Sequence, residues 1–258
     1  MGCKMCTQSR GLPQKDGGDL PVANLANIRD PLERFEKDFP FYRMEIAGFR
    51  QIIYSFGRDK FSIRDLAQRL PAQLWQSQLQ PNSKLVRLLM ELPGSEPCEQ
   101  DSLETLIDTN NFLLLAFIWC GGSLEDKGEA LFQCLNPPGQ SQTGVSANDK
   151  EWDKVFDQLC YLATVWTAQQ GQREGINCKQ YDEEETSKAI KAMRLSELEE
   201  PEKVGFIMLV FGYDSKVSKE DFLNVLSQSK CSWVFRPLKI RERLETFQDA
   251  DLIDEVLG

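Results

Sequence analysis

The chain has 258 residues, a formal net charge of −10 and a sequence pI of about 4.8. It contains no histidine, which excludes Ser-His and Cys-His nucleophilic catalysis and every histidine-ligated metal site. The sequence lacks the basic run that a general nucleic-acid-binding face requires. The longest apolar run, from Phe112 to Cys120, is too short to span a bilayer.

The cysteines and the remaining motifs narrow the class of protein further. Eight cysteines are scattered along the chain, and no secretory signal peptide is visible, so we expect reduced thiols in a cytosolic setting. Cys120, Cys134 and Cys160 fall in apolar helical runs and should behave as small buried hydrophobes. No phosphate-binding loop, nucleophile elbow or kinase motif set is present, so we expect no enzymatic activity.

The N-terminus carries a pattern for lipidation. Removal of Met1 would leave Gly2 at the N-terminus, followed by Cys3, with Cys6 where Ser or Thr is usual for myristoylation. One acyl chain anchors a protein only marginally, but Cys3 and Cys6 are placed to take palmitate as a second signal. The opening resembles the dual-acylation signature of Src-type kinases and G-protein α subunits. Two alternatives stay open, namely a zinc-binding Cys pair and an unmodified tail, and residues 11–30 have the composition of a linker.

Two helix–loop–helix phrases share one pattern of residues. In each, apolar residues at helical spacing are followed by Phe-Gly-x-Asp, a lone loop hydrophobe, a Ser that can cap the next helix, and a second apolar stripe. The alternative is two unrelated helix-turn-helix units. The matching positions are Ile46, Phe49, Ile53, Phe56, Gly57, Phe61 and Ser62 in the first phrase, and Val204, Met208, Phe211, Gly212, Val217 and Ser218 in the second.

Two further units are expected between these phrases. Ile107 precedes an apolar helix that ends at Gly121-Gly122, and Val145 precedes an amphipathic helix that runs from about Trp152 to Leu162. Ser123 is the expected cap of the helix that leads toward Val145. The wide gap before Val217 predicts an insertion near 169–202.

This arrangement resembles the EF-hand superfamily, in its neuronal-calcium-sensor and calcineurin-B-like branch. The resemblance implies an all-α fold of two lobes, each a pair of helix–loop–helix units joined by a minimal β-bridge, so that Phe61 should meet Ile107 and Val145 should meet Val217. The expected segments are an arm at 1–30, a first pair at 31–120, a second pair at 121–235 with the insertion, and an acidic tail helix at 236–258.

The loops lack the residues that hold calcium in this family. A calcium loop starts with Asp and ends with a bidentate Glu at position twelve. If the lone hydrophobe is position eight, position one is Tyr54, Gln100, Pro138 and Val210, and position twelve is Asp65, Asn111, Asp149 and Asp221. We therefore expect no metal cofactor; the weak candidates are Asp214, Ser215 and Asp221 in the fourth loop.

The leading functional hypothesis is a peripheral adaptor on the cytoplasmic face of a membrane, which binds an amphipathic helix of a partner protein without calcium switching. The apolar side of the tail, which includes Leu244 and Phe247, could fill the same groove. Alternatives are a structural subunit of a large cytoskeletal or mitochondrial assembly, cytosolic or cytoskeletal rather than membrane-bound, and a calcium sensor that uses the fourth loop. The candidate groove residues, each of which is also a candidate core residue, are Phe112, Phe117, Trp119, Trp152, Phe156 and Trp166.

Overall fold

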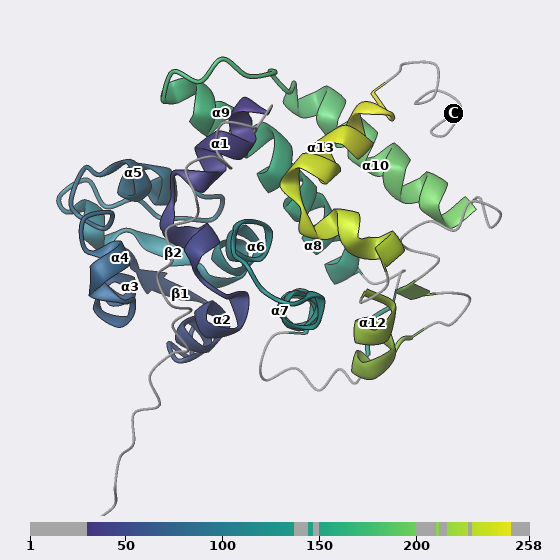
Figure 1. The fold of residues 1–258 in the computed structure, drawn as a ribbon, viewed down its shortest axis with the longest axis horizontal. Helices are drawn as coiled ribbons and strands as arrows, with labels where there is room; N and C mark the ends of the chain where they lie inside the picture. The colour runs from purple at the N-terminus through teal and green to yellow at the C-terminus, as the bar shows by residue number, and fades with distance from the viewer. Residues whose placement is uncertain are drawn as a thin grey trace, which may run out of the picture.

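The computed structural model describes residues 30–136, 144–146, 150–199, 210–211, 216–226 and 229–248, and this part of the chain is mainly helical (Figure 1). The predicted all-α class is confirmed at this level. The first half contains α1 (Pro31–Lys37), η2 (Pro40–Arg43), α2 (Ile46–Tyr54), β1 (Lys60–Ser62), α3 (Ile63–Arg69), α4 (Ala72–Trp75), α5 (Lys84–Met90), η3 (Ser102–Glu104), β2 (Leu106–Asp108) and α6 (Thr109–Trp119). The second half contains α7 (Leu124–Leu135), α8 (Lys150–Tyr161), η4 (Leu162–Trp166), α9 (Thr167–Arg173), α10 (Glu183–Glu199), α12 (Lys219–Leu226), η5 (Ser229–Phe235) and α13 (Pro237–Glu245).

The loops of the first two units are joined by a short antiparallel sheet. β1 pairs with β2 so that Phe61 lies opposite Ile107, and both side chains are fully buried. The pairing satisfies backbone hydrogen-bonding groups at the ends of the two loops. Because α3 directly follows β1 and α6 directly follows β2, the pairing also places the first residues of these two helices close together. The contact that the sequence predicts between these two hydrophobes is present.

The loops of the third and fourth units are joined in the same way by an isolated antiparallel bridge. Val145 N donates to Val217 O over 3.1 Å, and Val217 N donates to Val145 O over 2.9 Å. Gly144 allows this close approach, because a Cβ atom at that position would lie 2.6 Å from Val217 O. The second predicted contact is therefore also present, although only residues 210–211 of the helix that should enter the fourth unit lie within the described residues.

The serine caps that the sequence predicts are all in place. Ser62 Oγ accepts a hydrogen bond from Asp65 N, and Asp65 Oδ2 accepts one from Ser62 N, which completes a capping box. Ser123 caps α7, and Ser218 Oγ accepts from Asp221 N at the start of α12. These caps begin helices directly after the loops and so fix where each loop ends.

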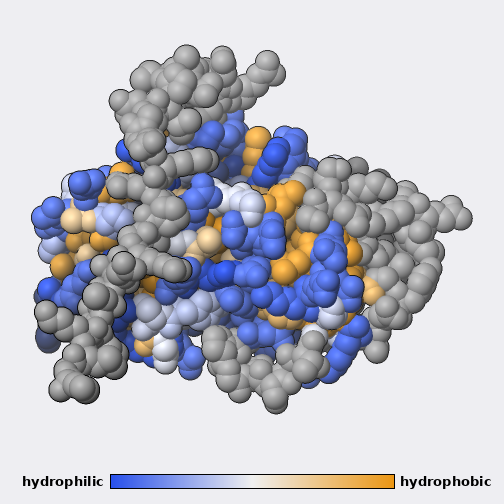
Figure 2. Space-filling model, turned by 60° about the horizontal axis from the view of Figure 1, so that its bottom comes forward, coloured by the Kyte–Doolittle hydropathy of each residue, from blue (hydrophilic) through white to orange (hydrophobic). Residues whose placement is uncertain are grey.

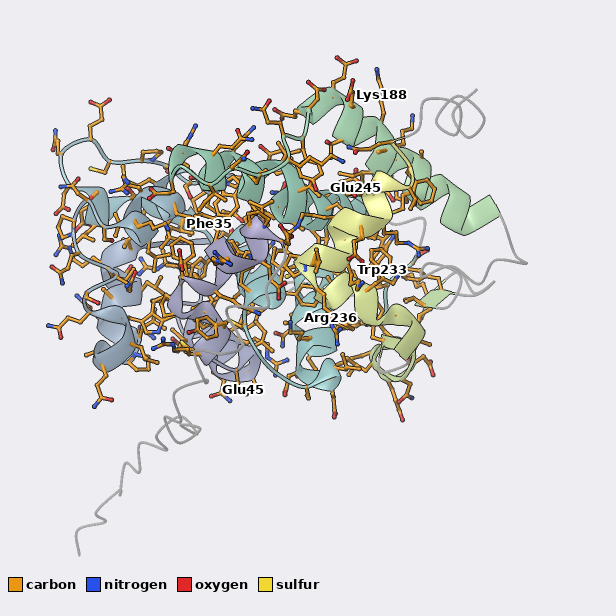
Figure 3. The ribbon with its side chains drawn as sticks, turned by 45° about the horizontal axis from the view of Figure 1, so that its top comes forward. Phe35, Glu45, Lys188, Trp233, Arg236 and Glu245 are labelled. Atoms are coloured by element: carbon orange, nitrogen blue, oxygen red, sulfur yellow. The ribbon has the colours of Figure 1, made fainter. Side chains whose placement is uncertain are left out.

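The structure adds detail in three segments. The span 169–202, in which the sequence predicts an insertion, contains the end of α9 and the seventeen-residue helix α10. The helix α1 begins directly after the predicted linker, with Asp30 as its side-chain cap and Pro31 in its first turn. The tail helix α13 is packed against the body, with Ile240 and Leu244 fully buried. In Figure 3, Lys188 of α10 points away from the body, while Glu245 marks the end of α13.

The two halves of the described chain share one hydrophobic core. A single cluster of buried residues runs from Phe35 in α1 to Leu244 in α13. The rings of Trp119 and Trp166 have centroids 6.0 Å apart and connect α6 to η4. Hydrophilic residues predominate on the face shown in Figure 2, and hydrophobic residues appear in smaller groups among them. The expected lobes are therefore packed as one body rather than as separate cores.

Candidate functional site

The loop of the first unit contains its own cation. Arg58 Nη2 lies 2.5 Å from Asp65 Oδ2, and the same carboxylate accepts the backbone N–H of Ser62. In the expected numbering of the loop, Arg58 is position five and Asp65 is position twelve. The carboxylate that would complete a calcium shell is thus engaged by a guanidinium and a helix cap.

The residues at position twelve of the second and fourth loops also form hydrogen bonds to neighbouring parts of the protein. Asn111 Nδ2 donates to Pro93 O over 2.8 Å. Asp221 Oδ2 accepts from Ser218 Oγ over 2.6 Å at the start of α12. Asp214 and Ser215 lie outside the described residues, and within the described residues no group of three or more carboxylate or cysteine side chains is arranged to hold a metal ion.

The residues predicted to carry lipids, Gly2, Cys3 and Cys6, also lie outside the described residues. In the part of the chain that the structure describes, no helix is long and apolar enough to cross a membrane.

The six aromatic residues predicted to contact a partner lie in the core. Phe112 and Phe117 are fully buried, and Trp119, the most accessible of the six, is 5% exposed; the others are Trp152, Phe156 and Trp166. Their rings contact one another and their neighbours, for example Phe117 with Phe235 at 5.4 Å. In this conformation these side chains form part of the core, and of the six Trp166 also lines the groove described below.

A buried ionic cluster joins the two ends of the described chain to its middle. Arg241 of α13 is 3% exposed; its Nη1 donates to Glu36 Oε1 over 2.7 Å, and its Nη2 lies 2.7 Å from Asp30 Oδ2. Arg241 Nη1 also donates to the backbone carbonyl of Ala163 over 2.9 Å. α13 is therefore part of the body, held by α1 and η4, and the cluster explains how this helix is fixed.

Glu36 has a raised pKa in this cluster, at about 7. Burial is the largest cause; the attraction of Arg241 acts to lower the pKa, and the negative charges of Asp30 and Glu33 act to raise it. One guanidinium thus serves two carboxylates, and protonation of Glu36 relieves the excess of negative charge.

The second half is built on a long helix with a wide turn in its middle. α8, η4 and α9 follow one another without a break from Lys150 to Arg173, and η4 is a π-helix. Thr167 Oγ1 donates to Leu162 O over 2.6 Å, five residues earlier, within this turn. π-helical turns shift the register of the side chains and are frequent at functional sites.

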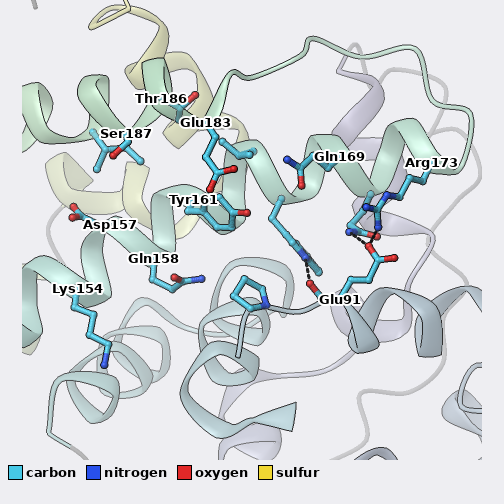
Figure 4. A pocket seen from close by; sticks show the side chains of 15 residues that line it. Glu91, Lys154, Asp157, Gln158, Tyr161, Gln169, Arg173, Glu183, Thr186 and Ser187 are labelled. Carbon is cyan, nitrogen blue, oxygen red and sulfur yellow. Dashed lines mark hydrogen bonds and ion pairs between the residues drawn. The ribbon is translucent and has the colours of Figure 1, made fainter. Parts of the chain in front are cut away.

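One face of this long helix borders an open groove of about 810 Å³ (Figure 4). α10 forms the opposite wall, and the segment around Glu91 and Pro93 closes one side. Trp166 Nε1 donates to Glu91 O over 2.9 Å, while Arg173 and Gln170 both contact the Glu91 carboxylate. The long helix contributes Lys154, Asp157, Gln158, Tyr161, Val165, Trp166, Gln169, Gln170 and Arg173, and α10 contributes Glu183, Thr186, Ser187 and Ile190.

Polar atoms in the groove lining are left without hydrogen bonds. Thr186 is 1% exposed and its Oγ1 has no partner, and neither Asp157 Oδ1 nor Gln158 Nε2 forms a hydrogen bond. The ion pair of Asp157 with Arg194 is long, at 4.0 Å. Each of these atoms is buried, so a ligand in the groove could reach it only if the surrounding side chains moved.

Sequence reasoning missed this groove, although its residues carried a signal. Asp157, Tyr161, Val165, Gln169 and Arg173 recur every fourth residue, and all of them except Val165 carry a polar group. A polar stripe ordinarily indicates a solvated face. Only the position of α10 alongside it makes that face the wall of a groove.

Comparison with known proteins gave no match, whether to a family model, to a curated protein or to a solved structure. No relative therefore bears on the EF-hand resemblance.

Proposed function

We propose that this protein is a non-catalytic adaptor on the cytoplasmic face of a membrane, anchored by acyl chains on Gly2 and Cys3, with Cys6 as a further palmitoylation site. Its body consists of EF-hand-like units and binds an amphipathic helix of a partner protein. The lobes are held by packing and do not switch with calcium.

The observation that carries this proposal is the groove along α8, η4 and α9. It is an open groove of about 810 Å³, and its lining combines polar side chains with the aromatic side chains of Tyr161 and Trp166. A groove bordered by a helix face is a common site for partner segments. The lack of histidine and of nucleotide-binding or nucleophile motifs supports a binding role over catalysis.

The loops support the absence of calcium switching. Arg58 already neutralises Asp65 in the first loop, and Asp221 is used to cap α12. The two antiparallel contacts between loops support the paired EF-hand-like units.

The membrane anchor is tested by the intact mass of the protein purified from a eukaryotic cell, together with flotation on liposomes. The proposal expects loss of Met1, one myristoyl group and at least one palmitoyl group. A Gly2→Ala variant should lose both the lipid mass and most of the flotation, whereas a Gly11→Ala variant should keep them. An unmodified mass with Met1 attached would reject the anchored adaptor.

A further inference from the structure

A cavity of about 260 Å³ lies at the start of α13, bordered by α1, the end of α6 and the end of η5. Its innermost side chains are apolar: Ile118, Trp119 and Phe235 are each at most 5% exposed. The half-buried Pro237 and Leu238 extend this apolar surface toward the solvent. A helix is about 10 Å across, so only single side chains of a bound segment can enter the cavity.

One of the charged side chains around this cavity has no ionic partner among the described residues. The lining contains the cations Lys37, Arg236 and Lys239 and the carboxylates Glu33 and Glu36. Lys37 pairs with Glu33 over 2.8 Å, Lys239 pairs with a neighbour on α13, and Glu36 pairs with the buried arginine of that helix. Arg236 is exposed and forms no ion pair within the part of the chain that the structure describes. Its guanidinium is therefore available to an incoming carboxylate beside an apolar cavity.

The segment 249–258 has the complementary composition. It lies outside the described residues and follows Gln248, which is the third residue after the end of α13. A segment that combines carboxylates with aliphatic side chains is complementary to a free cation beside an apolar cavity. Its acidic residues are Asp249, Asp251, Asp254 and Glu255, and its larger aliphatic residues are Leu252, Ile253, Val256 and Leu257.

The length of this segment is sufficient for a return along α13. Arg236 and Glu245 mark the two ends of that helix in Figure 3. The path from Gln248 back to Arg236 is about 18 Å at a helical rise of 1.5 Å per residue. An extended chain covers this distance in about six residues. Asp254, six residues after Gln248, therefore comes level with Arg236, while the two earlier carboxylates of the segment lie short of it.

We propose that the segment 249–258 folds back along α13 and occupies this cavity, with the carboxylates of Asp254 and Glu255 at Arg236 and the next aliphatic side chains in the cavity. An exposed ion pair alone stabilises such a contact only weakly, but the burial of aliphatic side chains adds to it. The short tether gives the segment an effective concentration in the millimolar range, which a free partner segment seldom reaches. The contact is autoinhibitory for this surface, because a partner segment of the same chemistry has to displace the tail. It concerns a surface other than the groove along α8, η4 and α9 and so goes beyond the proposed function.

The test uses the isotope-labelled full-length protein and measures the backbone order parameters of residues 252–258 by NMR relaxation. A synthetic peptide of residues 249–258 gives the values of the free segment. In the wild type we expect order parameters of about 0.85 around Asp254 and Glu255, as in a rigid helix, against values below about 0.6 in the free peptide.

Matched variants of the tail locate the contact within the segment. Asp254→Asn combined with Glu255→Gln should shift the order parameters at least halfway to those of the free peptide. Asp249→Asn combined with Asp251→Asn removes the same charge from the same segment and should leave the order parameters unchanged, because these two residues lie short of the cavity.

Matched variants of the body locate the contact on the cavity. Arg236→Gln should lower the order parameters as the Asp254 and Glu255 changes do. Arg34→Gln is the control, because Arg34 is an exposed arginine of α1 outside the cavity lining. Arg236→Glu combined with Glu255→Arg restores an ion pair of opposite direction and should raise the order parameters above those of Arg236→Glu alone.

Three results would overturn the inference: order parameters in the wild type equal to those of the free peptide, no change in Arg236→Gln, or an equal loss in the two double variants of the tail. Order parameters that fall when the protein is diluted about tenfold would show that the segment binds a second copy of the chain and would also overturn it. The measurement needs neither lipid nor a partner, so its result is independent of the proposed anchoring.

Discussion

The guanidinium group of Arg241 in α13 donates to the backbone carbonyl oxygen of Ala163 in η4 over 2.9 Å, although the two residues are 78 positions apart. In a π-turn the carbonyl groups accept from the amide five residues later instead of four, and the carbonyl of Ala163 in this turn accepts from Arg241. The same side chain neutralises carboxylates of α1. A single residue near the end of the described chain thus stabilises both the helix that borders the groove and the first helix of the fold.

Arg241→Met should destabilise the protein by about 3–5 kcal/mol, because it leaves the buried Glu36 carboxylate without its cation. Urea denaturation at pH 7.5 measures this loss. Lys239→Met, on the same helix, should cost less than about 1 kcal/mol, since Lys239 is exposed. Adding Glu36→Gln to Arg241→Met should recover part of the lost stability. If Arg241→Met costs no more stability than Lys239→Met, the role of the cluster is contradicted.

The stability of the protein should fall as pH rises from about 4.5 to about 7 through Glu36. Its pKa is raised in the folded state to about 7, so the folded state holds a proton that the unfolded chain has already released. Protonated Glu36 contributes fully to the free energy of unfolding when the pH is below its pKa in the unfolded chain. This contribution, about 3 kcal/mol, is lost once the pH is above its pKa in the folded protein.

The measurement is the difference in unfolding free energy between the wild type and Glu36→Gln at pH 5 and at pH 7.5. The variant should gain on the wild type as pH rises, because it has no proton to lose there. For Glu33→Gln, on the same helix and partly exposed, the free energy of unfolding should change with pH nearly as it does in the wild type. Parallel curves for Glu36→Gln would show that Glu36 is not the titrating group.

Calcium at about 1 mM should leave the melting temperature unchanged. A sensor-grade EF-hand would be saturated at this concentration and would add at least about 2.7 kcal/mol. In this chain the Asp65 carboxylate is already bound to Arg58, so the first loop offers calcium no free acidic ligand at position twelve. A rise in melting temperature that Asp221→Asn abolishes would instead favour the fourth-loop sensor.

Gly144→Ala should open the contact between the third and fourth loops, because its Cβ would lie 2.6 Å from Val217 O. We expect a loss of about 1–3 kcal/mol, with faster hydrogen exchange at the Val145 and Val217 amides. Gly57→Ala is the comparison: that position has a φ of +61° but nothing within 4 Å of the added Cβ. It should cost about 1–2 kcal/mol through backbone strain while leaving the exchange of those two amides unchanged. Unchanged exchange in Gly144→Ala would contradict the steric argument.

Local sequence signals were sufficient for the parts of the fold that depend on neighbours along the chain. Ser62, Ser123 and Ser218 begin helices because their hydroxyl groups satisfy amides two or three residues later, which any sequence with such a spacing can do. The loop hydrophobes Phe61, Ile107, Val145 and Val217 could be paired because the EF-hand resemblance implies a contact between the hydrophobes of neighbouring loops, and both contacts are present.

The sequence by itself determined the helical class, the caps and the lack of calcium ligands, since each follows from residues within one turn or one loop. Only the tertiary structure decided which side chains are accessible. It buried the six aromatic residues in the core, where apolar area leaves water, and it placed α10 beside a helix face to form the groove. It also joined Arg241 to Glu36 and Ala163, residues far apart in the chain whose pairing no local pattern encodes.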